Sequence, residues 1–279
     1  MSSTPKAKMI DCHAHIYPSS IGESLSTQLD RAKPLVHGII SVPVTLADAH
    51  EILDLSQNTY KDFIFAGAGL HPDQNGRCVR EDEMLALEQF VHQNHSKLVC
   101  IGEVGLDYTP YVFASADNPK GMTEDGLKKM QENVLARHIK LSRDYGLPLN
   151  VHSRSAGHYT IDTLGAYGAQ KVVLHAFDGK ASYALKGVEM GYNFSVPPSI
   201  IRSPHKQTLV SKLPLSHLLL ETDSPCLGPE KGVDNEPANI IVSAQEIARI
   251  KELDIDEVIN ETTENALGLF EHLKGAIQL

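Results

Sequence analysis

The sequence lacks any long apolar run, and it has few cysteines. None of its apolar runs approaches the ~20 residues that a transmembrane helix needs, so no membrane association is expected. The four cysteines, Cys12, Cys78, Cys100 and Cys226, form no C-x-x-C pair. Cys12 and Cys100 lie in apolar runs, as small buried residues do. This cysteine usage favours a reducing, intracellular compartment, and we expect a cytoplasmic or nuclear protein.

Positive charge is also scarce, because the sequence has 25 Lys and Arg residues and 35 Asp and Glu residues, which gives a formal net charge of −10. This balance argues against a protein that coats nucleic acid through a broad basic face. A nucleic-acid enzyme with a local positive site stays possible, since bound divalent metals would themselves supply positive charge. No protein partner is predicted.

The first eight residues, MSSTPKAK, are polar and carry lysines without an apolar stretch behind them. A secretory signal needs such an apolar stretch. We therefore expect residues 1–8 to form a flexible tail and residues 9–273 to form one domain.

The rest of the chain alternates short apolar, β-branched runs with amphipathic segments. Three of the amphipathic segments predict helices clearly. One begins after Thr45 as its N-cap, one lies near 80–95, and one ends at Gly146. Eight strands alternating with helices predict a single-domain (β/α)8 TIM barrel, with extra C-terminal helices near 238–251 and 255–273. A doubly wound open sheet is the alternative. The expected strands are 9–12, 38–44, 63–70, 98–104, 147–152, 171–177, 192–197 and 217–223.

Histidines and carboxylates stand at the ends of several expected strands. Residues two apart on a strand point the same way, so His13 and His15 could bind one metal ion. A single histidine there is more often an ordinary hydrogen-bonding residue, but a carboxylate inside the apolar strand 98–104 needs a partner or a metal. In a barrel all these positions meet at one rim, the C-terminal one. The candidate metal ligands are His13, His15, Glu103, His152, His175 and Asp223.

Six candidate ligands suggest two divalent ions ~3.5–4 Å apart, with one carboxylate between them. Glu103 is central and is the expected bridge. His13, His15 and Asp223 would bind one ion, and His152 and His175 the other. This mixture of ligands accepts zinc, manganese, iron or cobalt.

The motifs DCHAH, GLHP, IGEVGLD, NVHSR, LHAFDG, ETDSP and NEP occur in this order between about residues 9 and 270. In this set and order the chain resembles the TatD-like metal-dependent hydrolases of the amidohydrolase superfamily. The segments NVHSRSAG, PPSIIRS and LGPEK are similar to an animal branch of that family.

The resemblance implies a metal-dependent hydrolase of phosphate esters, expected to be a deoxyribonuclease of the 3′–5′ exonuclease or abasic-site type. DNA or another phosphodiester would bind locally at the metal site. The six candidate ligands match the family's ligand positions, and His71 matches a residue near the substrate phosphate. Arg154 is similar to a phosphate contact, although a surface salt bridge would also explain it. Asp223 would accept the proton of a metal-activated water, and His71 would assist at the phosphate.

The chain departs from the family pattern at three places. Asp234 stands where many relatives have arginine, residues 109–125 form a longer loop, and the segment SVPPSIIRSPHK replaces a glycine and threonine pattern. These changes leave the candidate ligands intact and put the preferred substrate in question. The alternatives are a hydrolase of a small-molecule amide, lactone or phosphoester, and a non-catalytic scaffold or nucleic-acid-binding protein.

Overall fold

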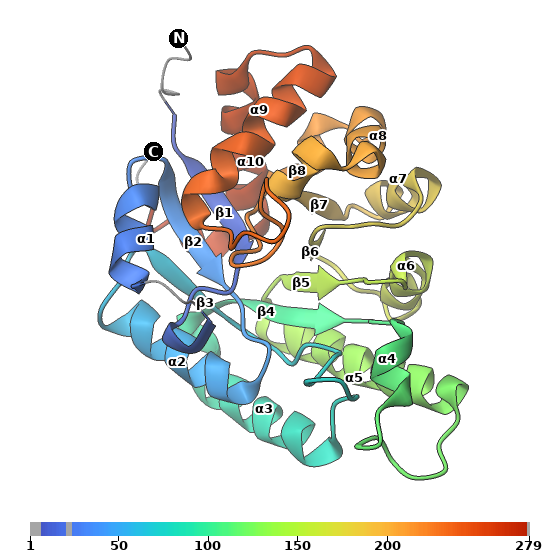
Figure 1. The fold of residues 1–279 in the computed structure, drawn as a ribbon. Coiled ribbons are helices and arrows are strands. Elements are labelled where there is room, and N and C mark those ends of the chain that lie inside the picture. The colour runs from blue at the N-terminus through green and yellow to red at the C-terminus, as the bar shows by residue number, and fades with distance from the viewer. Residues whose placement is uncertain (1–6, 21–23, 278–279) are drawn as a thin grey trace.

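The protein is a barrel of parallel strands surrounded by helices (Figure 1). This computed structural model describes residues 7–20 and 24–277, and within them eight strands pair in chain order from β1 to β8. The predicted barrel is confirmed, and the doubly wound alternative is wrong because no strand order is reversed. The strands are β1 (Met9–Ala14), β2 (Val36–Ser41), β3 (Ile64–Ala68), β4 (Leu98–Gly105), β5 (Leu149–His152), β6 (Val172–Leu174), β7 (Asn193–Val196) and β8 (Leu218–Leu220).

Helices connect successive strands and lie outside them (Figure 1). The α-helices are α1 (Leu25–Ala32), α2 (Leu46–Gln57), α3 (Glu81–Asn94), α4 (Pro110–Ala114), α5 (Glu124–Tyr145), α6 (Gly157–Ala166), α7 (Ala181–Glu189), α8 (Pro204–Lys212), α9 (Ile240–Lys251) and α10 (Ile255–Leu269). Short 3₁₀ helices are η1 (Pro18–Ser20), η2 (His95–Lys97), η3 (Pro198–Arg202), η4 (Leu215–His217), η5 (Pro237–Asn239) and η6 (Glu271–Leu273).

Local signals in the sequence fix several of these helix ends. The Thr45 side chain accepts from the Asp48 backbone N–H, and the Asp48 carboxylate accepts from the Thr45 N–H, which forms a capping box at α2. Helix α5 ends at Gly146, whose φ of +69° is a left-handed conformation that suits glycine. Both predicted boundaries are confirmed. No helix among the described residues is long and apolar enough to cross a membrane.

The last predicted helix ends earlier than expected. We expected helix to residue 273, but α10 stops at Leu269 and a 3₁₀ turn follows. The physical reason is burial, because Phe270 and Leu273 pack into the apolar cluster inside the barrel. That cluster includes Ile10 and Cys12 of β1. The C-terminal segment thus closes the barrel end opposite the strand carboxyl ends.

The first and last strands are joined without a regular ladder in the described part of the chain. The Asp11 carboxylate accepts from the Thr222 backbone N–H at 2.9 Å and from the Thr222 hydroxyl at 2.6 Å. The Asp223 backbone N–H donates to the His13 carbonyl at 2.8 Å. The buried Asp11 side chain therefore adds to the few backbone hydrogen bonds that join these two strands.

The expected N-terminal tail falls mostly on residues 1–6, which lie outside the described residues. Lys8, the last residue of that expected tail, contacts the barrel. Its Nζ donates to the Lys33 carbonyl at 3.0 Å, and its own carbonyl accepts from the Thr263 hydroxyl at 3.4 Å.

Candidate metal centre

The predicted ligands meet at one end of the barrel, where the strands have their carboxyl ends. His13 lies near the end of β1, Glu103 lies within β4 and His152 ends β5, whereas the other three follow a strand. Most of them line one cavity of about 320 Å³, and His13 lies buried behind it. The cavity lining also includes His71, Ser153, Arg154, Lys206 and Cys226.

Four of these side chains form a first cluster. The His13 Nε2 atom lies 3.3 Å from Asp223 Oδ1 and 3.6 Å from Glu103 Oε2. The His15 Nε2 atom lies 3.3 Å from Glu103 Oε2 and 3.5 Å from Asp223 Oδ1. Two atoms bound to one tetrahedral ion at ~2.0–2.1 Å are roughly 3.3–3.4 Å apart. The donor atoms of this cluster therefore have the spacing that a shared ion requires.

A second cluster surrounds the other oxygen of Glu103. His152 Nδ1 and His175 Nε2 lie 2.7 and 2.8 Å from Glu103 Oε1, and 3.1 Å from each other. His71 Nε2 lies 3.5 Å from the same oxygen. The two Glu103 oxygens thus face different sets of imidazoles, as a bridging carboxylate does. His71, expected beside the phosphate, is also within reach of this cluster.

Hydrogen bonds behind the first cluster orient its imidazoles. The His13 Nδ1 atom lies 2.8 Å from Asn150 Oδ1, and the Asn150 amide donates to the Cys12 carbonyl. The His15 Nδ1 atom lies 2.9 Å from the Val42 carbonyl. Because these acceptors take the Nδ1 proton, Nε2 is the nitrogen of each ring that is left to bind a metal ion.

Two carboxylates stand behind the second cluster, and sequence reasoning did not single them out. Asp107 Oδ2 lies 3.4 Å from His152 Nε2, and Glu221 Oε2 lies 3.9 Å from His175 Nδ1. The Asp107 carboxylate accepts from the Thr109 backbone N–H, and Glu221 accepts from the Ala176 N–H. Their motifs, GLD and ETD, were visible, but an acidic residue after a strand is also typical of a turn or cap.

The electrostatics keep the central carboxylate ionised. Burial alone would raise the pKa of Glu103, but the surrounding imidazoles, His71 and His175 first, hold it well below its usual range. Burial and the neighbouring His13 lower the pKa of His175 to about 3, and burial lowers that of His71 to about 4. Ionised Glu103 and neutral His175 and His71 have the protonation states that metal ligands need. Burial would lower the pKa values of His13 and His15, but the Glu103 and Asp223 carboxylates raise both.

His152 differs from His175 and His71. Burial would lower its pKa, but the neighbouring carboxylates of Asp107 and Glu103 outweigh burial and raise the pKa to about 9. A metal ion that binds His152 therefore displaces a proton, which makes binding at this position dependent on pH.

The buried polar atoms fit a metal as well. Within the described residues, His13 Nε2 is buried without a hydrogen-bond partner, as are His152 Nε2 and His175 Nδ1. A buried polar atom without a partner is costly unless something else satisfies it. The His13 atom points at the first cluster, where an ion would satisfy it.

Two cations line the same cavity. Arg154 is exposed, and no carboxylate among the described residues forms an ion pair with its guanidinium, so the salt-bridge interpretation has no support. Lys206, from α8, donates to the Ala176 carbonyl at 2.6 Å. Sequence reasoning missed Lys206, although it lies in the SVPPSIIRSPHK segment that departs from the family pattern.

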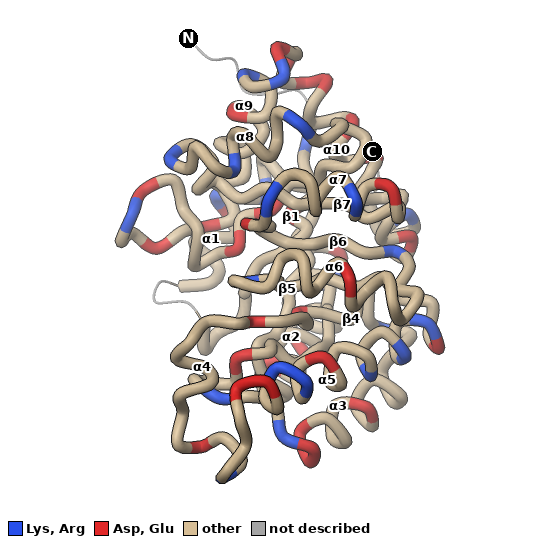
Figure 2. Tube along the Cα trace, turned by 90° about the vertical axis from the view of Figure 1, so that its right-hand side faces the viewer, with Lys and Arg blue, Asp and Glu red and all other residues tan. Residues whose placement is uncertain are grey.

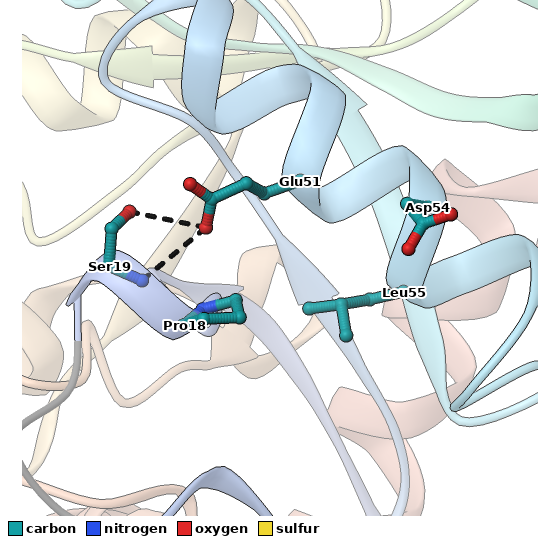
Figure 3. Close-up of a pocket in the computed structure, with 5 residues that line it drawn as sticks. All are labelled: Pro18, Ser19, Glu51, Asp54 and Leu55. Atoms are coloured by element: carbon teal, nitrogen blue, oxygen red, sulfur yellow. Dashed lines mark hydrogen bonds between the residues drawn. The ribbon is translucent and has the colours of Figure 1, made fainter.

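A second depression, of about 430 Å³, lies between η1 and α2 (Figure 3). Its Glu51 carboxylate accepts hydrogen bonds from the Ser19 backbone N–H and hydroxyl. The described residues that line it include no histidine and no cation, so it lacks the groups that catalysis at a phosphate needs. They are Pro18, Ser19, Glu51, Asp54 and Leu55.

A (β/α)8 barrel with a histidine and carboxylate cluster at its C-terminal rim has the architecture of a barrel hydrolase with a metal site. Residues 10–271 match the family model described as TatD related DNase. The chain belongs to this family, and the resemblance seen in its motifs is confirmed.

Individual relatives agree with this membership. The chain is 42% identical over 276 residues to Deoxyribonuclease TATDN3 of Homo sapiens, covering 97% of each chain. It is 30% identical to the Uncharacterized metal-dependent hydrolase YabD of Bacillus subtilis, covering 94% of this chain and 98% of that one. Among solved structures, the TatD homologue YJJV of Escherichia coli superposes with a TM-score of 0.81 at 26% identity, covering 94% and 98% of the two chains.

Proposed function

We propose that this protein is a deoxyribonuclease that hydrolyses phosphodiester bonds at a centre of two divalent metal ions. The observation that carries the proposal is Glu103, whose two oxygens face two separate sets of imidazoles within 2.7–3.6 Å. Family membership and the name of the human relative support the substrate class.

In this proposal His13, His15 and Asp223 would hold one ion, His152 and His175 would hold the other, and Glu103 would contribute to both sites. Zinc, manganese, iron and cobalt all suit these donors. When bound, the ions would polarise the phosphoryl oxygen and lower the pKa of water. Residues 9–273 would form the hydrolase domain, behind a tail at residues 1–8.

The protein's own side chains have three tasks at the substrate. Asp223 accepts the proton of the attacking water through its carboxylate, which lies between His13 and His15. His71 and Arg154 bind the phosphate as its charge increases, and Lys206 adds a second cation to the cavity wall. Glu103 and His13 are almost fully buried, and the lower dielectric around them strengthens these interactions.

We further propose that the protein works inside the cell, in the cytoplasm or nucleus. Its four cysteines are free thiols, three of them buried, as expected in a reducing compartment. DNA or a related phosphodiester would bind locally at the metal site.

A turnover panel tests the function. Protein reconstituted with manganese, zinc or cobalt would be offered single-stranded DNA, duplex DNA with an abasic site, and simple phosphodiesters, alongside amide and lactone substrates. Cleavage from a 3′ end or at the abasic site distinguishes the two nuclease types. Rapid hydrolysis of an amide or lactone without cleavage of any phosphodiester would favour the small-molecule alternative and contradict the proposal.

A further inference from the structure

One motif of the sequence, NEP at residues 235–237, supplies none of the described residues that line the cavity. Its Asn235 lies in the connection from β8 to η5, which Figure 1 draws as an irregular orange loop. The side chain is nevertheless only 1% exposed. A buried amide is stable only when its polar atoms have hydrogen-bond partners, so the partners of Asn235 indicate its role.

Asn235 binds the chain on both sides of Asp223. Its Nδ2 atom donates to the Thr222 carbonyl at 2.7 Å, and its backbone N–H donates to the Pro225 carbonyl at 2.8 Å. Its Oδ1 atom accepts from the Asn239 side chain at 2.9 Å. The side chain therefore links the segment around Asp223 to η5.

This segment needs support because Asp223 has an unusual backbone conformation. Its φ is +56°, in the left-handed region that residues other than glycine adopt infrequently. A residue stays in this region only when the surrounding contacts fix the chain. In this conformation Asp223 Oδ1 lies 3.3 and 3.5 Å from the Nε2 atoms of His13 and His15. The direction of the carboxylate thus depends on the peptide groups beside it.

The peptide group that joins Thr222 to Asp223 is held at both of its edges. Its N–H donates to the His13 carbonyl at 2.8 Å, and its carbonyl accepts from the Asn235 amide. A peptide group is planar, so one hydrogen bond would let the plane turn, whereas bonds at opposite edges fix it. The orientation of this plane sets the φ of Asp223, and Asn235 therefore helps to determine where the Asp223 carboxylate points.

The Asn235 side chain is itself held in place by its surroundings. Gly228 lies so close that a Cβ atom there would be 3.2 Å from the Asn235 Cβ. The next residue, Glu236, accepts from Arg31 Nε of α1 at 2.7 Å. Lys and Arg are interspersed with Asp and Glu along the tube in Figure 2, and Arg31 with Glu236 is one such pair of opposite charge. These contacts give the Asn235 amide a defined position from which it donates.

We propose that Asn235 is a positioning residue, which orients the Asp223 carboxylate toward His13 and His15 by holding the peptide group between Thr222 and Asp223. The inference rests on the proposed function, in which Asp223 would hold an ion and accept the proton of the attacking water. It requires the amide specifically, because an amide donates to the Thr222 carbonyl and an ionised carboxylate cannot.

Two substitutions remove the amide donor. Asn235→Ala deletes it, and Asn235→Asp keeps the shape of the side chain but places a carboxylate oxygen opposite the Thr222 carbonyl. We expect each variant to lose roughly 10–100-fold in affinity for one of two manganese ions, measured by calorimetric titration of the metal-free protein. At saturating manganese, kcat for a simple phosphodiester should fall with KM little changed, because Arg154 and His71 would bind the phosphate from other elements.

Two control variants separate positioning from a general loss of stability. Asn265→Asp alters an asparagine whose side chain donates to the Leu215 and Leu218 carbonyls, at the beginning of β8 and not beyond its end. Glu236→Ala removes the neighbouring contact with α1. Both variants should bind two manganese ions like the unaltered protein. Circular dichroism and urea unfolding report how far each variant is destabilised.

The outcomes distinguish the positioning role from the proposed function. Unchanged manganese affinity in both Asn235 variants, an equal loss in Asn265→Asp, or a change confined to KM would each overturn the positioning role. Failure of the unaltered, manganese-loaded protein to cleave any phosphodiester would instead overturn the proposed function. The loss of manganese affinity in the Asn235 variants would then still support the positioning of Asp223.

Discussion

At the scale of single residues, Glu103 has the central position, because each carboxylate oxygen faces a different cluster. We predict that Glu103→Ala removes at least one metal ion and lowers turnover by more than the ~10–100-fold typical of outer-shell substitutions. The barrel should stay folded, since the contacts of this side chain are to the imidazoles of the site. Metal analysis, circular dichroism and turnover check the prediction, and a variant with full metal content and normal turnover would disprove the bridging role.

A substitution at Asp107 tests the residues that lie behind the candidate ligands. Its Oδ2 atom faces His152 Nε2 at 3.4 Å, so Asp107→Asn removes the negative charge that orients this imidazole. We expect metal affinity or activity to fall by roughly 10–100-fold, as measured by metal titration. Asp162→Asn, on the outer surface of α6, is the matched control. Equal effects of the two substitutions would argue against the role of Asp107.

The sequence revealed the candidate metal ligands better than the residues that orient them. His13, His15 and Glu103 were recognisable because imidazoles and a carboxylate at strand ends are unusual. Asn150 and Glu221 were not, because their roles depend on which imidazole nitrogen they meet across two strands. Such pairings follow from strand register and side-chain rotamers, which one sequence does not specify.

At the scale of elements, Asp11 joins β1 to the segment after β8. Asp11→Ala leaves the Thr222 N–H and hydroxyl buried without this acceptor, at a cost of about 1–3 kcal/mol per unsatisfied group. We predict a lower free energy of unfolding in urea. Asp11→Asn should lower the free energy of unfolding less, because an asparagine side chain can still form hydrogen bonds with both the Thr222 N–H and the Thr222 hydroxyl. Similar stability of the alanine variant and the unaltered protein would show that β1 and β8 do not need this junction.

Helix α5 is coupled to the end of β3 through His138. Its Nε2 accepts from the Leu70 N–H at 3.4 Å, its Nδ1 lies 2.9 Å from the Val134 carbonyl, and burial lowers its pKa to about 4. The unfolded chain takes up this proton near pH ~6.5, whereas the folded one does not until about pH 4. Stability from His138 is therefore complete above pH ~6.5 and is lost as pH falls toward about 4.

Urea unfolding from about pH 7 to about pH 4.5 checks this prediction. As the pH falls, uptake of one proton by the unfolded chain should lower the free energy of unfolding of the unaltered protein by up to ~1.4 kcal/mol per pH unit. The free energy of unfolding of His138→Gln should fall less over the same pH range. Identical pH dependence of the two proteins would mean that His138 does not contribute.

The element order was predictable because each buried parallel strand is apolar on both faces. The eight expected strands all exist, with ends that differ by a few residues. The end of α10 was not predictable, because Phe270 and Leu273 continue the apolar pattern of a helix while packing into the barrel interior. That contact joins segments far apart in the sequence, and local periodicity does not report it.

At the scale of the whole molecule, the net charge of −10 determines how DNA binding should respond to salt. The affinity for single-stranded DNA falls with a log–log slope of roughly 0.7 per neutralised phosphate. With Arg154 and Lys206 as the cavity cations, we predict a shallow slope of about 1.4.

Arg154→Ala should reduce the slope by about 0.7 and weaken binding without emptying the metal site. Lys186→Ala, on the remote Asp162 pair, should leave the slope unchanged. Anisotropy across a salt series measures all three, and a steep slope in the unaltered protein would reveal a wide basic surface and contradict local binding.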